Sequence, residues 1–174
     1  MRHVPRALVT ASVAATVLAG CSAPVETPGT RTYDVPGSDG LTVSAPSSWT
    51  SSSVDGVYYL SSPAEVDGVR PTVVIVPGPL EGQSLDEAAG QTSLYGTEHL
   101  REWRVVDEGA DTLGGFDAYR VSGEHETRGV DVVEDVVVAA IGEDEAAWVT
   151  ITTAAGDSEG AAEARAVAEQ ISLR

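Results

Sequence analysis

The segment Val136–Ile141 restricts the possible folds more than any other part of the chain. It consists of Val-Val-Val-Ala-Ala-Ile, so neither of its two faces carries a polar side chain. Successive side chains of a strand point to opposite faces of a sheet, so a strand of this kind needs cover on both sides. We therefore expect a strand over Val130–Ile141 in the interior of a sheet, with helices on both faces.

Shorter strand patterns surround this segment, and turn residues such as Leu113-Gly114-Gly115 and Gly142-Glu143-Asp144 separate them. Three early strands are expected to pair antiparallel with one another. Their ranges are Leu41–Ala45, Val57–Leu60 and Pro71–Val76. Three further strands are expected at Trp103–Asp107, Phe116–Val121 and Ala146–Thr153.

Two segments have helical patterns. Ser84-Leu85-Asp86-Glu87 fits a capping box, in which the Ser and Glu side chains each accept a bond from the other residue's amide. The last segment carries an apolar stripe at helical spacing, formed by Ala161, Ala164, Val167, Ala168 and Ile171. Strands that outnumber helices in this way predict an α+β fold, an antiparallel β-sheet with helices packed on its faces.

Composition limits the way in which such a domain is stabilised and what it binds. The chain of 174 residues is long enough for one domain, and its low aromatic content of 5% leaves Val, Ile, Leu and Ala to build the core. Its single cysteine excludes an intramolecular disulfide. The net charge of −17 and the scattered arginines argue against a nucleic-acid partner and against attraction to anionic lipid headgroups.

Residues 1–20 have the organisation of an export signal. Arg2 and Arg6 precede an uncharged apolar stretch, Ala7–Ala19, that is too short to span about 30 Å of hydrocarbon. Leu18-Ala19-Gly20-Cys21 resembles the lipobox of bacterial lipoproteins, which implies signal-peptidase recognition of the first three residues, cleavage before Cys21 and diacylglycerol on its sulfur. The alternative is an ordinary secretory signal with an incidental cysteine.

Acylation of Cys21 would hold the protein at the outer face of the cytoplasmic membrane, because two or more acyl chains anchor stably at about 0.8 kcal/mol per buried CH₂. Residues 21–32 are then the lipid anchor and a flexible tether rich in Pro, Thr and Gly. Extended, the tether reaches at most roughly 36 to 40 Å. Residues 33–174 are expected to form the single α+β domain.

Residues 156–160 match the G-x-S-x-G pattern of serine hydrolases and lie between a predicted strand and helix. In such hydrolases a histidine follows the serine, but none follows Ser158, so we interpret Asp157 or Ser158 as the cap of the last helix. His99 and His125 are expected to be solvated. A different arrangement of a serine with either histidine stays open, because triads are defined by geometry.

No metal or cofactor site is predicted. The acidic segments Asp107–Asp111 and Glu143–Glu145 lack the alternating ligands of a calcium loop and are interpreted as solvated turns. A phosphate loop is excluded because the chain has no lysine. The three tryptophans are expected to anchor the core, and exposure of two of them would instead indicate a binding face. These are Trp49, Trp103 and Trp148.

Four motifs resemble the LpqN-type lipoproteins of actinobacteria, and the resemblance spans roughly residues 33 to 174. They are Tyr33-Asp34-Val35-Pro36, Gly40–Trp49, Ser84–Ala89 and Leu113–Val121. That family is similar in fold to PsbP and to the Ran-binding Mog proteins, which implies an α/β/α sandwich. It brings no established catalytic residues. The resemblance implies a membrane-tethered accessory of the cell envelope that binds lipid-related enzymes or lipid itself.

Three functions therefore remain to be compared. The first is a non-enzymatic binding or accessory module for an envelope protein or for lipid assembly. The second is a carrier of lipid or of a small apolar ligand, which requires an apolar cavity between sheet and helix. The third is a serine hydrolase that uses Ser158.

Overall fold

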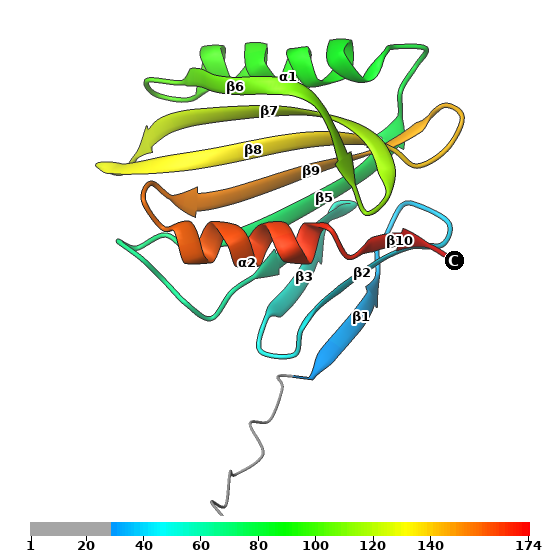
Figure 1. Cartoon of the computed structure of the whole chain (residues 1–174), viewed down its shortest axis with the longest axis horizontal. Coiled ribbons are helices and arrows are strands. Elements are labelled where there is room, and N and C mark those ends of the chain that lie inside the picture. The colour runs from blue at the N-terminus through cyan, green and yellow to red at the C-terminus, as the bar shows by residue number, and fades with distance from the viewer. Residues whose placement is uncertain (1–28) are drawn as a thin grey trace, which may run out of the picture.

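Seven strands form the main antiparallel sheet of this protein, of which the computed structural model describes residues 29–174 (Figure 1). The expected signal peptide, the acylation site Cys21 and most of the tether lie outside the described residues. The order of the strands across the sheet is β3 (Thr50–Val54), β4 (Val57–Ser61), β5 (Thr72–Pro79), β9 (Glu145–Ala154), β8 (Val130–Ala140), β7 (Phe116–Thr127) and β6 (Arg104–Leu113).

Strand β8 lies in the interior of this sheet between β7 and β9, as its two apolar faces require. Val137 and Ala139 are buried in the core on one face, and Val138 is buried in a second core on the other. Because the sheet separates the two cores, one continuous apolar segment supplies both. The predicted α+β fold with helices on both faces is confirmed.

Helix α1 (Leu85–His99) packs on one face, mainly against β6, β7 and β8. The predicted capping box is present: the Ser84 amide donates to Glu87 Oε2 at 2.9 Å, and the Ser84 side chain accepts from the Glu87 amide. Small residues allow the helix to approach the sheet closely. The core that it covers contains Leu80, Ala88, Ala89, Val121, Val138 and Ala146.

Helix α2 (Ser158–Ala168) packs on the opposite face together with a second, three-stranded sheet (Figure 1). The order of this small sheet is β1 (Thr30–Asp34), β2 (Leu41–Pro46) and β10 (Ile171–Leu173). Its apolar side chains and those of α2 bury the main core against the long strands. The molecule therefore has three layers: α1, the seven-stranded sheet, and α2 with the small sheet.

Three expectations about boundaries and pairing are wrong. Of the three early strands, β4 and β5 pair antiparallel as expected, but β2 pairs with β1 and β10 instead. Helix α2 ends at Ala168, and Ile171 belongs to β10, because the chain turns at Glu169 and Gln170 and returns to β2. The expected tether is also too long by three residues, since β1 begins at Thr30.

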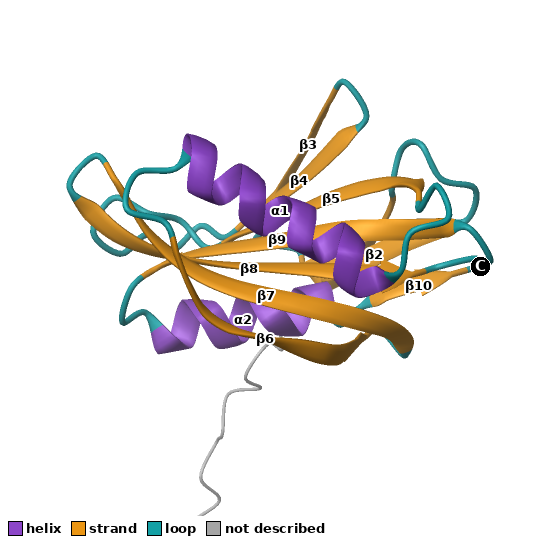
Figure 2. Ribbon diagram, turned by 90° about the horizontal axis from the view of Figure 1, so that it is seen from above, coloured by secondary structure: helices purple, strands orange, loops and turns teal. Residues whose placement is uncertain are grey.

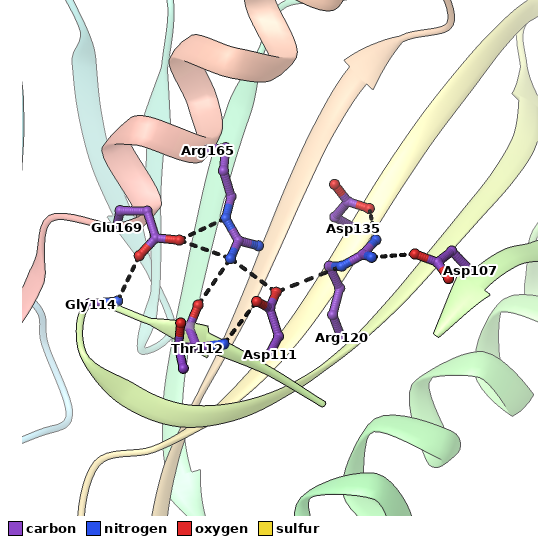
Figure 3. A network of polar contacts seen from close by, with 8 residues as sticks. All are labelled: Asp107, Asp111, Thr112, Gly114, Arg120, Asp135, Arg165 and Glu169. Atoms are coloured by element: carbon purple, nitrogen blue, oxygen red, sulfur yellow. Dashed lines mark hydrogen bonds and ion pairs between the residues drawn. The ribbon is translucent and has the colours of Figure 1, made fainter. Parts of the chain in front are cut away.

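A network of ion pairs connects α2 to β6, β7 and β8 on the same face (Figure 3). Arg165 of α2 donates to Asp111 Oδ2 at 2.9 Å, and Asp111 lies 3.7 Å from Arg120. Arg120 also pairs with Asp107 and with Asp135. The expectation that Asp107–Asp111 forms a solvated turn is therefore wrong. The segment lies in β6, and the carboxylates of Asp107 and Asp111 pair with arginines.

Trp103 is held between two glycines, one on α1 and one on β7. A methyl group added at Gly123 would lie 2.0 Å from Trp103 Cη2, and one at Gly96 would lie 2.7 Å from Cε2. Neither contact leaves room for a side chain, so the indole and the two backbones pack directly.

We predict that Gly123→Ala destabilises the domain by about 1–3 kcal/mol, because the added methyl group displaces Trp103 from its site. Gly90→Ala is the matched control: no atom lies within 4 Å of its added Cβ, and alanine stabilises a helix interior by up to about 1 kcal/mol. Unfolding in urea, followed by tryptophan fluorescence, measures both. Equal stability of the two variants would contradict the packing described for Trp103.

Candidate binding groove

Helix α1 covers only part of its face of the sheet. It packs on β6, β7 and β8, and β3, β4 and β5 extend beyond it (Figure 2). The strand register places side chains of β4, β5 and β9 on the uncovered part of this face, and six of them define what we call the open face. They are partly buried or exposed: Tyr59 on β4, Val74 and Val76 on β5, and Trp148, Thr150 and Thr152 on β9.

A groove of about 420 Å³ runs along the border between α1 and the open face. Its helical wall is formed by residues at i, i+3, i+4 and i+7 spacing, which share one face of α1. Trp148 lies in the opposite wall, where a Cβ added at Gly78 would come 3.4 Å from the indole. The lining residues are Pro79, Leu80, Glu81, Gln83, Ala88, Gln91, Thr92, Tyr95 and Trp148.

The chemistry of this groove is that of a binding surface. Glu81 is the one carboxylate in its lining, and the other polar groups are amides and hydroxyls. In its lining, Tyr95 is 60% exposed, and the Tyr95 ring stacks on His99 with centroids 4.1 Å apart. Aromatic and aliphatic side chains with a few hydrogen-bonding groups provide contact area and orientation.

A second pocket, of about 520 Å³, is polar. Its carboxylates are largely paired: Arg104 bonds to Glu124, and Arg101 lies 2.9 Å from Glu126. In residues 29–174 no three His, Cys, Asp or Glu side chains are grouped so that they could hold a metal ion. This pocket is therefore a weaker candidate for ligand binding than the groove beside α1.

His125 lines the polar pocket, and the expectation that it is solvated is wrong. It is only 8% exposed, because β7 extends beyond the predicted Val121 to Thr127 and brings its ring to 6.1 Å from that of Trp103. Its Nδ1 lies 3.2 Å from Thr127 Oγ1. Its Nε2 lies 3.2 Å from Glu134 Oε2, in a geometry that does not satisfy Nε2 as a hydrogen-bond donor.

Ser158 is the exposed first residue of α2. Asp157 caps that helix, because its Oδ1 accepts from the Gly160 amide at 2.9 Å, as predicted. His99 and His125 belong to the α1 side of the sheet, whereas α2 lies on the other side. In the part of the chain that the structure describes, Ser158 has no histidine partner, and this geometry gives no support to a hydrolase.

The predicted roles of the tryptophans are only partly confirmed. Trp49 is a core anchor: it is 3% exposed, and its Nε1 donates to Glu163 at 2.9 Å. Trp103 and Trp148 are partly buried in the α1 core. The segment Glu143–Glu145 is exposed between β8 and β9, as expected for a solvated turn, although Glu145 already begins β9 and Asp144 accepts from the Gly82 amide.

Comparison with known proteins gives a family. The model of the family described as "Probable lipoprotein LpqN" matches residues 31–172. The chain belongs to the LpqN family. The expected LpqN resemblance is therefore confirmed over nearly the whole described domain.

No curated protein sequence matches the chain significantly. In residues 29–174 of this LpqN-family protein, no helix has the length and hydrophobicity needed to cross a membrane.

Solved structures show the same fold at low sequence identity. LpqN of Mycobacterium tuberculosis, which is involved in cell envelope biogenesis, is 18% identical with a TM-score of 0.57, covering 83% of this chain and 91% of that one. Cyanobacterial PsbP from Synechocystis is 14% identical with a TM-score of 0.61, covering 90% and 99%. A Bacteroides thetaiotaomicron protein is 16% identical with a TM-score of 0.57, and the chain spans 48% of its length.

The predicted site residues all belong to the lipidation motif. Leu18, Ala19, Gly20 and Cys21 lie outside the described residues, so acylation stays a prediction. The groove was not predicted as such. Tyr95 is the signal that could have indicated it, because it lies at i+7 from Ala88 on the helix face that also carries Gln91 and Thr92, a mixture of apolar and hydrogen-bonding groups.

Burial raises the pKa of Glu134 above its ordinary value, and the nearby His125 partly opposes this effect. A carboxyl group whose pKa is raised by folding binds protons more tightly in the folded chain. Its contribution to stability is therefore present below the ordinary pKa of a glutamate and is lost as pH rises through the raised value.

We predict that the stability advantage of Glu134→Gln over the parent increases as pH rises from about 4 upwards, since the amide stays neutral. Urea unfolding of both proteins across that range measures the difference. Glu143→Gln, at an exposed turn residue, is the matched control and should show no such trend. A parent and Glu134→Gln variant with parallel pH profiles would contradict the burial effect.

Proposed function

We propose that this LpqN-family protein is a lipid-anchored, non-enzymatic accessory module at the outer face of the cytoplasmic membrane. It presents the groove beside α1 and the open face to a protein partner of the cell envelope. The observation that carries this proposal is the half-covered sheet, which leaves Trp148 and Tyr95 beside a groove with one carboxylate. The family membership and the envelope role of the M. tuberculosis LpqN protein support the location.

A protein partner is favoured over a carried lipid for two physical reasons. The groove is open and continues into the flat open face, whereas a carrier needs a cavity that encloses most of its ligand. The net charge of −17 also disfavours anionic headgroups, while it does not hinder apolar and amide contacts with a neutral or basic protein surface. Lipid binding in the groove is the alternative that experiments must distinguish.

The anchor is tested by Cys21→Ser in the full-length chain. We expect the parent protein to incorporate labelled fatty acid and to sediment with membranes, because acyl chains on this sulfur would hold the domain there. The variant should lose the label and leave the membrane fraction when its signal peptide is removed. Unlabelled parent protein, or a variant that sediments like the parent, would refute the anchor.

The binding face is tested by photo-crosslinking in intact cells. A photoreactive residue at Tyr95 should give an adduct with one envelope protein, and the same residue at Arg128, exposed at the β7–β8 turn, is the matched control. Trp148→Ala should weaken the complex roughly 30-fold if this indole is a hot spot worth about 2 kcal/mol. Ser158→Ala should leave the adduct unchanged.

Each outcome of this crosslinking experiment is informative. Adducts at Tyr95 that contain lipid alone would support the carrier instead of the protein-binding module. Equal crosslinking at Tyr95 and Arg128 would refute the groove as the binding face. Loss of the adduct in Ser158→Ala would contradict the proposed non-enzymatic role.

A further inference from the structure

Strand β3 is an edge strand with no obvious protection. It pairs with β4 on one side only, and all five of its residues, Thr-Ser-Ser-Ser-Val, are exposed. Val54 is 58% exposed although it is apolar. The hairpin that β3 forms with β4 projects from the body of the domain (Figure 2). An edge of this kind leaves backbone amides and carbonyls free to pair with another strand.

The other sheet edges carry the features that normally prevent such pairing. β6, at the far edge of the same sheet, contains three acidic residues and one arginine, and its register shifts between Val105 and Asp107. β1 carries Arg31 and Asp34, and β10 has only three residues. Among the strands that the structure describes, β3 is the edge strand of at least five residues without a charged side chain.

The hairpin geometry shows which backbone groups of β3 are free. Val54 and Val57 flank a two-residue turn, in which Asp55 and Gly56 both have positive φ, so these two valines form a hydrogen-bonded pair. Hydrogen bonds alternate along an antiparallel strand, and Ser52 therefore also bonds toward β4. The N–H and C=O groups of Ser51 and Ser53 point to the open edge.

We infer that β3 pairs antiparallel with β3 of a second copy of this chain, about a two-fold axis at Ser52. In this register Ser51 of each copy faces Ser53 of the other, so the four outward groups of each strand all form hydrogen bonds. Val54 comes opposite Thr50 of the second copy and is covered. If the two-fold axis passed through Ser51 or Ser53 instead, Ser51 of one copy would no longer face Ser53 of the other, and fewer of the outward groups of these serines would be paired.

Charge permits a second copy at this edge because β3 carries no charged side chain. Two chains that each carry −17 repel one another, and they can approach closely only where the contact itself is neutral. Asp55 is the acidic residue adjacent to β3. In the proposed register, the Asp55 of each copy lies opposite Trp49 of the other copy. The two Asp55 residues lie roughly 20 Å apart along the strands at about 3.3 Å per residue, beyond a Debye length at physiological salt.

The contact is small. A pair of five-residue strands covers less surface than the roughly 1,200–2,000 Å² of a stable interface, so we expect reversible association that is strongest at high local concentration. Trapping the pair in intact cells is therefore a better test than measuring the mass of the purified protein. Oxidative crosslinking of introduced cysteines in the full-length chain provides such a trap.

Ser52→Cys should form a disulfide-linked dimer on mild oxidation, because residues facing one another in a non-hydrogen-bonded pair have Cα atoms about 4.5 Å apart, within disulfide range. Ser51→Cys alone is the matched control. In the proposed register, the Cα atoms of the two introduced cysteines would lie about 8 Å apart, which is too far for a disulfide. Ser51→Cys and Ser53→Cys expressed together should restore the dimer. The parent chain, oxidised in the same way, shows how much dimer forms through Cys21.

Proline substitution gives a second test that does not depend on disulfide geometry. Ser51→Pro removes an outward N–H and keeps the bonds from β3 to β4, so it should abolish the Ser52→Cys dimer without unfolding the hairpin. Monomer alone in Ser52→Cys, or equal dimer in Ser51→Cys, would overturn the inference. Crosslinking of Ser52→Cys to a different protein would also overturn it and would assign the edge to a foreign strand.

Discussion

The unequal cover of the two faces of the seven-stranded sheet determines the rest of this structure. Six gaps of about 4.8 Å separate seven strands, so the sheet is roughly 29 Å wide. One helix with its side chains is about 10–12 Å in diameter and covers two or three strands. On one face α2 is supplemented by a second sheet, and the core there is closed. On the other face α1 lies alone, and strands β4, β5 and β9 keep a partly solvated surface.

The sequence of the uncovered strands is adapted to this position. Over Val136–Ala140 of β8 both faces are apolar, but on β9 the residues that follow Trp148 on the open face are Thr150 and Thr152. Threonine suits a half-exposed sheet surface because its branched side chain packs on the strand while its hydroxyl is hydrated. The one large aromatic group on β9 is Trp148, and it lies where the edge of α1 forms the groove.

Local patterns predicted the parts of the fold that depend on local physics. The double-faced apolar segment, the capping box at Ser84 and the cap of α2 each follow from residues close together in sequence. The pairing of β2 with β10 does not, because Val43 and Ile171 are 128 positions apart and the C-terminal segment also fits the stripe of a helix. His125 was assigned to solvent for a similar reason: its neighbours Glu124 and Glu126 are polar, and only the long pairing of β7 with β8 buries it.

The candidate site was harder to predict than the fold, because a groove is defined by what the neighbouring element fails to cover. Charge provides the remaining physical argument. In a domain with this excess of acid, the groove has one carboxylate and β3 has none, so a second macromolecule meets little local repulsion at these surfaces. Apolar contact at Trp148 and backbone pairing at β3 are both short-range interactions. They can therefore act together on a protein whose overall charge would otherwise keep partners at a distance.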